Sequence, residues 1–337
     1  MSTNVFGIDL GTNNIKIYSK NENQILVEKN MIAIENKKNL FAYGDSAYEM
    51  YEKAPSNIQI SYPLNCGVIA DIQNMQTLIR YFVTDISKTL PKNSDFYISV
   101  PFDITDVEKR AFLDLLKSSD LKARKVYGVW KAVADGLGLE IDVKNSQGVM
   151  VVDVGYETTE ISILSLGGVV LSRLIKMGGA RFDESIRAAV RKEYELFIGE
   201  KTAESIKMDL DNLERENKKA VVYGRAVRSG LPVKREVSVD LVNDCLRENI
   251  NNIIDNIKLI LERTPPELGA DIYRHGIYLT GGASQVSHFA ELVSNGTGLQ
   301  VNVAAEPIKS VALGLQTIIN DDNYKSVATA FEGMAGV

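Results

Sequence analysis

A turn pattern that occurs twice constrains the fold of this chain more than any other feature of its sequence. In residues 149–170 an apolar strand runs into Asp153 and Gly155, and a second apolar strand follows Thr158 and Thr159. The residues just before Asp153 are apolar and mostly β-branched, which favours a strand buried on both faces. An unpaired carboxylate at the end of such a strand is costly to desolvate, so we expect a bound cation or its water shell beside it.

The same stretch carries donors that suit a phosphate group. Gly155 permits a tight turn whose backbone N–H groups can face an anion, and two threonine hydroxyls follow. Taken alone, the stretch fits an ordinary surface hairpin equally well. Residues 5–19 repeat the pattern with Asp9, Gly11 and Thr12 in the same order. The repeat predicts a duplicated domain in which two hairpins face one ligand, because two unrelated turns would not need an Asp at the same place.

Composition narrows the classes of function. A chain of 337 residues is long enough for two domains or one bilobed domain. The net charge of -6 leaves no excess of lysine and arginine to neutralise phosphate backbones, so we expect no nucleic-acid partner. Two distant cysteines, no secretory signal and no long apolar run predict a cytoplasmic protein.

The remaining patterns alternate between strands and helices. We expect helices over 183–196, 202–213 and 241–263, and a capping box at Thr105 and Glu108 opens another. A third apolar strand ends in Gly281 and Gly282. These glycines would let the backbone approach a ligand closely, although a plain glycine cap is the alternative.

Eight motifs taken in order resemble the actin-like ATPase superfamily and, within it, the MreB family of bacterial actins. They are GIDLGT at 7–12, GVIAD at 67–71, VPFDITDVEKRAFLD at 100–114, VVDVGYETTE at 151–160, SLG at 165–167, IGEKTAE at 198–204, TPPEL at 264–268 and GIYLTGGAS at 276–284. The resemblance implies an α/β actin-like ATPase fold with two duplicated lobes around a nucleotide cleft.

Four subdomains are implied by the same resemblance. The large subdomain of the first lobe would take residues 1–32, 67–145 and 315–337, and its small subdomain residues 33–66. The second lobe would take residues 146–181 and 246–314 for its large subdomain and residues 182–245 for its small one.

The resemblance also implies ATP or ADP with Mg²⁺ in the cleft. Asp9 and Asp153 would orient waters on the metal, which keeps several waters in such sites. The residues that would bind the nucleotide are Gly11, Thr12, Asn13 and Asn14 in the first loop, Gly155, Thr158 and Thr159 in the second, Gly179, Glu204 and Lys207 on the flanking helices, and Gly281, Gly282, Ala283 and Ser284 in the adenosine turn.

One departure from the family pattern predicts slow hydrolysis. The family places Glu-Pro at the start of a first-lobe helix, and that Glu positions the attacking water. Anchoring on Gly136 and Gly138 puts Val129 and Trp130 at the Glu-Pro position, with Lys131 next. Valine cannot orient water, and losing a positioned base costs about 10² to 10⁴ in rate. We therefore expect an ATP binder with at best slow ATPase activity.

A second departure lies in the phosphate loop itself. The Gly-Gly-Gly run of the family is replaced by Gly155, Tyr156 and Glu157. A carboxylate near the γ-phosphate would repel it unless it points away or pairs with a cation. We hypothesise a salt bridge between Lys131 and Glu157, and Thr158 completes the set of residues expected around the reacting phosphate.

These observations favour a filament protein in which ATP acts mainly as a structural ligand. Its partners would be copies of itself, with other actin-like paralogues as further candidates. The alternative is an actin-fold ATPase with normal turnover that uses Glu157 or another carboxylate. A sugar kinase or a chaperone fits less well, because the chain is short and has no peptide-binding domain after the ATPase fold. The polar loop at 91–95 lacks the apolar residues with which this family binds membranes, so association with a membrane stays open.

Overall fold

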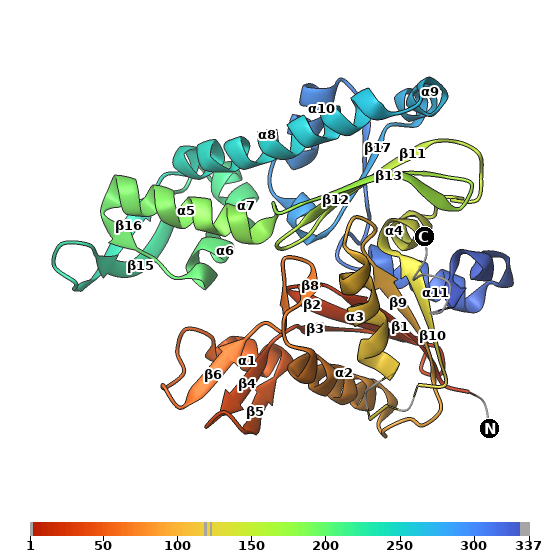
Figure 1. The fold of residues 1–337 in the computed structure, drawn as a ribbon. Coiled ribbons are helices and arrows are strands. Elements are labelled where there is room, and N and C mark those ends of the chain that lie inside the picture. Colours follow the sequence, from red (N-terminus) through yellow and green to blue (C-terminus); the bar gives the residue numbers. More distant parts are fainter. Residues whose placement is uncertain (1–2, 118–119, 122, 331–337) are drawn as a thin grey trace.

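The protein forms two large sheets, each covered by helices and each joined to a smaller sheet (Figure 1). The structure is a computed structural model that describes residues 3–117, 120–121 and 123–330. Two ends of the predicted first-lobe subdomain, residues 1–2 and 331–337, lie outside the described residues. The subdomain boundaries themselves stay a prediction.

The sheet of the first lobe has six strands in the order β19-β10-β9-β1-β2-β3. The central strand β1 pairs antiparallel with β2 and parallel with β9, so the chain turns back tightly on one side and crosses over on the other. The strands are β1 (Val5–Leu10), β2 (Asn14–Ser19), β3 (Gln24–Lys29), β9 (Asp95–Val100), β10 (Lys125–Trp130) and β19 (Thr329–Ala330), and the helices that follow them are α2 (Ile72–Ser87), α3 (Asp106–Lys117) and α4 (Lys131–Gly138).

The sheet of the second lobe repeats this arrangement in five strands, ordered β13-β12-β11-β17-β18. Its central strand β11 pairs antiparallel with β12 and parallel with β17, as β1 does with β2 and β9. The strands are β11 (Val149–Val154), β12 (Thr159–Ser165), β13 (Gly168–Ile175), β17 (Ile277–Thr280) and β18 (Val301–Val303), and the helices are α5 (Gly179–Tyr194), α8 (Val239–Arg263), α9 (Pro266–His275), η1 (Gly282–Gln285) and α10 (Phe289–Thr297). The chain then returns to the first lobe through α11 (Ser310–Asn320), which packs on α4 and on β1, β2 and β9, and through η2 (Asp322–Val327).

The matching topology confirms the predicted duplication. In each lobe the strand that ends in the Asp-x-Gly turn is the central strand of its sheet. The register places Asp9 opposite Lys16 in the first lobe and Asp153 opposite Glu160 in the second. The two turns therefore occupy equivalent places, and the residues opposite the two aspartates carry opposite charges.

One small sheet lies beside each large sheet, both on the same side of the molecule (Figure 1). The first contains β4 (Ile32–Glu35), β5 (Asn39–Tyr43) and β6 (Ile58–Ser61) with helix α1 (Gly44–Met50). The second contains β14 (Leu196–Phe197), β15 (Ala220–Ala226) and β16 (Pro232–Val237) with α6 (Glu200–Met208) and α7 (Leu210–Arg215). A two-stranded hairpin, β7 (Leu64–Asn65) and β8 (Val68–Ile69), leads back into the first lobe.

Three apolar clusters hold the large sheets. One lies between the first sheet and α2 and α3, and another between the second sheet and α5, α8 and α10. The third packs α4 and α11 against Tyr18 and Tyr97 of the first sheet and Val151 and Leu164 of the second. Both faces of the central strands are therefore buried, which explains the near-continuous apolar sequence of β11.

Most helix predictions are confirmed, with shifts at the ends. The Thr105 N–H donates to the Glu108 carboxylate over 2.7 Å, and the Glu108 N–H donates to the Thr105 hydroxyl over 3.3 Å, as a capping box requires. The predicted helix 241–263 begins two residues earlier, at Val239. The Ser238 hydroxyl caps it by accepting a hydrogen bond from the Asp240 N–H. The predicted helix 202–213 is divided into α6 and α7 at Asp209. Among the described helices, none combines the length and apolar character needed to cross a bilayer.

Helices α4 and α11 touch backbone to backbone where the lobes meet. A Cβ on Gly314 would lie 1.8 Å from the Ala134 carbonyl oxygen, and one on Gly138 would lie 1.8 Å from the Ser310 carbonyl oxygen. No side chain fits at either position without separating the helices. Glycine at both crossing points thus sets the distance between α4 and α11.

We predict that Gly314→Ala lowers the free energy of unfolding by about 3 kcal/mol, because the methyl group must displace a packed helix. Gly269→Ala on α9 is the matched control, since a Cβ there meets nothing within 4 Å. A helical Gly→Ala change in open space should be neutral or stabilise by up to about 1 kcal/mol. Urea unfolding curves of wild type and both variants measure these free energies. Equal changes in the two variants would contradict the packing argument.

Candidate functional site

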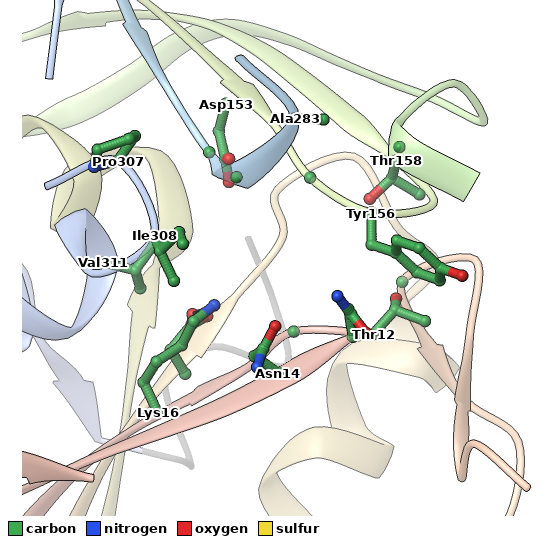
Figure 2. A pocket seen from close by; sticks show the side chains of 18 of the residues that line it. Thr12, Asn14, Lys16, Asp153, Tyr156, Thr158, Ala283, Pro307, Ile308 and Val311 are labelled. Carbon is green, nitrogen blue, oxygen red and sulfur yellow. Dashed lines mark hydrogen bonds and ion pairs between the residues drawn. The ribbon is translucent and has the colours of Figure 1, made fainter. Parts of the chain in front are cut away.

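A cavity of about 640 Å³ lies between the two lobes, at the carboxyl ends of the central strands. Figure 2 shows Thr12, Asn14 and Lys16 entering it from the first lobe and Asp153 and Thr158 from the second. In open α/β sheets ligands bind outside the carboxyl ends of the strands. Both Asp-x-Gly turns thus border one space, as the repeat predicted.

Most residues predicted for the site line this cavity. They are Asp9, Gly11, Thr12, Asn13, Asn14, Lys131, Asp153, Gly155, Thr158, Gly179, Glu204, Lys207, Gly281, Gly282 and Ala283. Four predicted residues do not line it, namely Val129, Glu157, Thr159 and Ser284. The Thr159 hydroxyl donates to the Met177 carbonyl and the Ser284 hydroxyl to the Gly281 carbonyl, each over 2.7 Å, so these two residues hold the loops beside the cavity.

Asp9 forms a buried ion pair within the first lobe. Its Oδ2 atom lies 3.0 Å from the Lys16 Nζ atom, and its Oδ1 atom accepts a hydrogen bond of 2.9 Å from the Ser99 hydroxyl. Burial alone would raise the pKa of Asp9, but the ammonium groups of Lys16 and Lys131 and these hydrogen bonds lower it below its ordinary value. Asp9 therefore stays ionised at the floor of the cavity.

Asp153 forms its ion pair across the lobes. Its Oδ2 atom lies 2.5 Å from the Nζ atom of Lys131, the first residue of α4. The predicted salt bridge between Lys131 and Glu157 is wrong. The Glu157 carboxylate instead accepts a hydrogen bond from the Cys66 N–H in the β7–β8 hairpin. Glu157 consequently points away from the cavity and joins the second lobe to the first.

Lys131 and Val129 have different environments. Val129 lies on β10 and is fully buried among the apolar side chains that pack α4 and α11. Lys131, two residues further on, lines the cavity. Burial opposes its charge, but Asp153, Asp9, Asp135 and Glu160 together raise the pKa of Lys131 above its ordinary value. The start of α4 therefore contributes an ammonium group to this edge of the cavity.

Glu160 is a carboxylate that the sequence did not single out. It lines the cavity, and its Oε1 atom accepts from the Phe102 N–H over 3.2 Å. Its buried Oε2 atom has no hydrogen-bond partner among the described residues. Burial raises the pKa of Glu160 to about 7, although the Lys131 ammonium lowers it in part.

Asp135 connects the helices under the ion pair. Its Oδ1 atom accepts from the Ser310 hydroxyl over 2.7 Å, and the Ser310 oxygen accepts from the Thr280 hydroxyl over 2.8 Å. This chain of hydrogen bonds joins α4, α11 and β17. Burial and the charge of Asp153 raise the pKa of Asp135 well above its ordinary value. Asp135 therefore stabilises the base of the cavity and forms no direct ion pair with Lys131.

The second lobe also contributes Lys207 and Gly281 to the lining of the cavity. The Lys207 ammonium pairs with Asp183 at 2.7 Å and donates to the Gly179 carbonyl over 3.2 Å. Gly281 has a φ of 88°, and a Cβ there would lie 2.2 Å from the Asp153 Oδ1 atom. Only glycine fits this approach, so the turn at Gly281 is more than a plain cap.

Hydrogen bonds also cross the open rim of the cavity. The Tyr48 hydroxyl of α1 donates to the Glu204 carboxylate of α6 over 2.6 Å, and the Tyr51 hydroxyl donates to Glu200 over 3.3 Å. Tyr156 from the second phosphate loop also donates to Glu200. Helix α1 beside the first small sheet is thereby joined to helix α6 beside the second, across the rim of the cavity.

Sequence reasoning missed several lining residues, including Lys16, Lys29, Tyr48 and Glu160. A signal existed for two of them, because Lys16 and Glu160 are charged residues within apolar strands that directly follow an Asp-x-Gly turn. Together with the predicted loops, they give a cavity with backbone N–H groups, hydroxyls and ammonium groups on both sides. That set of donors suits a polyphosphate anion.

Comparison with known proteins identifies relatives of nearly full length. The family model described as MreB/Mbl protein matches residues 3–326. The cell shape-determining protein Mbl of Bacillus subtilis strain 168 is 35% identical over 319 residues, which cover 94% of this chain and 95% of that protein. The cell shape-determining protein MreB of Escherichia coli strain K12 is 33% identical over 323 residues, or 93% and 92% of the two chains.

Solved structures agree with these sequence relatives. The crystal structure of MreB 5 of Spiroplasma citri bound to AMPPNP superposes with a TM-score of 0.90 at 30% identity, over 97% of this chain and 98% of that one. The MamK double helical filament gives a TM-score of 0.78 at 21% identity, over 95% and 99% of the two chains. The MamK match shows the actin-like fold alone.

We predict that Glu160→Gln changes how stability depends on pH. The folded protein raises the pKa of Glu160 from 4.5 to about 7, so its contribution to stability is present below pH 4.5 and is lost as the pH rises towards 7. Relative to wild type, the variant should gain up to about 3 kcal/mol of unfolding free energy across this window. Urea unfolding at several pH values measures it, with the exposed Glu262→Gln on α8 as control. Parallel profiles of wild type and Glu160→Gln would refute the prediction.

Proposed function

The chain belongs to the MreB/Mbl family, and on that premise we propose that it binds ATP and ADP between its lobes and assembles with copies of itself into filaments that govern cell shape or cell-body mechanics. The observation that carries the proposal is the pair of equivalent phosphate-type loops, which face one cavity from two lobes. A ligand that contacts both loops favours one angle between the lobes. Such a ligand promotes assembly by its higher affinity for the assembly-competent form, and no hydrolysis is needed.

Three further points support a nucleotide as that ligand. The S. citri relative binds AMPPNP in one structure and ADP in another. The cavity combines phosphate-type donors with the turn at Gly281, Gly282 and Ala283, where a flat base would contact backbone. Lys207 is fixed between Asp183 and Gly179, so its ammonium is already positioned beside the cavity.

We further propose that hydrolysis is slow. At the start of α4 the cavity receives the Lys131 ammonium, and Val129 is buried away from it. An ammonium cannot accept a proton from water. It also stabilises the ground-state phosphate about as well as the transition state, and such uniform binding does not accelerate the chemical step.

The second candidate is an ATPase with normal turnover. Glu157 is engaged by the Cys66 N–H and points away, so the carboxylate that favours this reading is Glu160. Its Oε2 atom is buried and lacks a hydrogen-bond partner among the described residues, so a small opening of the cavity would let it accept a bond from water. A proton acceptor with a pKa of about 7 is also well matched to general base catalysis.

The proposed setting is the cytoplasm, with copies of the chain as the main partners and other actin-like paralogues as further ones. Association with a membrane is a separate proposal. Liposome co-sedimentation at low salt tests it, because electrostatic contacts with anionic lipids weaken as salt is added.

We predict that ATP and AMPPNP increase the pelleted fraction of the protein to the same extent in ultracentrifugation. AMPPNP suffices because binding, and not cleavage, favours the closed lobes. Gly281→Ala should not respond, since its methyl group would collide with the Asp153 carboxylate, whereas Gly269→Ala should respond as wild type does. Protein that stays monomeric with every nucleotide would contradict the filament proposal.

We predict that Lys131→Ala keeps the rate of phosphate release at saturating ATP within about threefold of wild type, since removing the ammonium supplies no proton acceptor. Val129→Glu should not raise the rate either, because its carboxylate would enter the apolar core. A malachite-green assay with excess ATP measures all three proteins. Fast wild-type release that is abolished by Glu160→Gln or Glu157→Gln would establish the second candidate instead.

A further inference from the structure

Both aspartates that would hold waters on a metal are already paired with lysines. The Asp9 Oδ2 atom lies 3.0 Å from the Lys16 Nζ atom, and the Asp153 Oδ2 atom lies 2.5 Å from the Lys131 Nζ atom. Figure 2 shows Lys16 and Asp153 reaching towards the same part of the cavity from opposite lobes. The aspartates are 2% and 5% exposed, so these pairs are held in place by the surrounding protein.

The other carboxylate oxygens are also engaged or crowded. Asp9 Oδ1 accepts the Ser99 hydroxyl over 2.9 Å, and Asp153 Oδ1 packs against the backbone of Gly281. Mg²⁺ demands near-octahedral oxygen ligands and binds through one or two available carboxylates. The residues present do not fit Mg²⁺ as the resemblance implied.

Lys131 places a cation on the lining of the cavity, between the two lobes. It is the first residue of α4 in the first lobe, yet its ion pair is with the second lobe. Its ammonium carries a positive charge, as lysine does in proteins, and the ion pair with Asp153 holds it on the lining of the cavity. A permanent positive charge is thus fixed between the two phosphate-type loops.

We propose that the ammonium groups of Lys131 and Lys16 supply the counter-charge for the nucleotide phosphates, so that this chain binds ADP and ATP without a divalent cation. The inference rests on the proposed function and deepens it by naming the counter-ion of that site. Lysine ammonium groups bind phosphate oxygens through charge-assisted hydrogen bonds. Because they belong to the protein, they also link nucleotide binding to the angle between the lobes.

The test is calorimetric titration of the full chain with ADP, in buffer containing either MgCl2 or EDTA. The wild-type affinity should change less than about threefold between the two buffers. Lys131→Met should bind ADP at least about tenfold more weakly than wild type in EDTA, because one charged hydrogen bond is lost. MgCl2 should restore binding to the variant, since the Asp153 Oδ2 atom is released from its ion pair. Lys131→Arg, which keeps the charge, should remain insensitive to EDTA.

The outcomes separate this inference from the proposed function. Wild-type protein that binds ADP in MgCl2 but loses about tenfold or more of that affinity in EDTA would overturn the inference and leave the proposed function intact. Wild-type protein that binds neither ADP nor ATP in either buffer would overturn the proposed function as well. The wild-type comparison decides even if Lys131→Met does not fold, which circular dichroism would show.

Discussion

The backbone contact between α4 and α11 is the constraint on which the cavity depends. These helices lie between the two large sheets, and the third apolar cluster packs both sheets against them. Gly138 and Gly314 let the helix axes approach until carbonyl groups and α-carbons touch. Helix α11 packs on strands β1, β2 and β9 of the first sheet, whereas α4 contacts strands of both sheets. The close crossing therefore holds α4, and with it Lys131, against the first lobe at the place where the second sheet meets it.

Charged and polar groups of the site lie on the same two helices. Lys131 begins α4, Asp135 lies one turn later, and Ser310 begins α11. The ion pair from Lys131 to Asp153 joins the two lobes, and so does the hydrogen bond that the Thr280 hydroxyl of β17 donates to Ser310 of α11. A change in lobe angle would alter these distances, and buried ion pairs are sensitive to distance because little solvent screens them. The energies of this ion pair and this hydrogen bond therefore depend on the angle between the lobes.

Much of this arrangement could be predicted from the sequence, because it depends on local patterns. The strand, Asp and Gly order at Asp9 and Asp153 predicted the duplicated sheets and brought both loops to one cavity. Side-chain partners were harder, because they depend on how distant elements pack. Nothing near Glu157 in the sequence indicated that the Cys66 N–H would reach it. The comparison with the family pattern at α4 was anchored on Gly136 and Gly138. Val129 and Lys131 are only two residues apart, yet Val129 is buried in the core and Lys131 lines the cavity.

One carboxylate at the rim, that of Glu204, can take part in both nucleotide binding and closure of the lobes. Glu204 lines the cavity, where the resemblance places the adenosine, and the same carboxylate already accepts the Tyr48 hydroxyl from the other lobe. A nucleotide that contacts Glu204 must do so without breaking this bond, or replace it with one of its own. In either case its affinity depends on whether the rim is closed, and by linkage the closed rim depends on the nucleotide. In a site of this kind, nucleotide binding changes the angle between the lobes without hydrolysis. A filament subunit with slow hydrolysis would need this property.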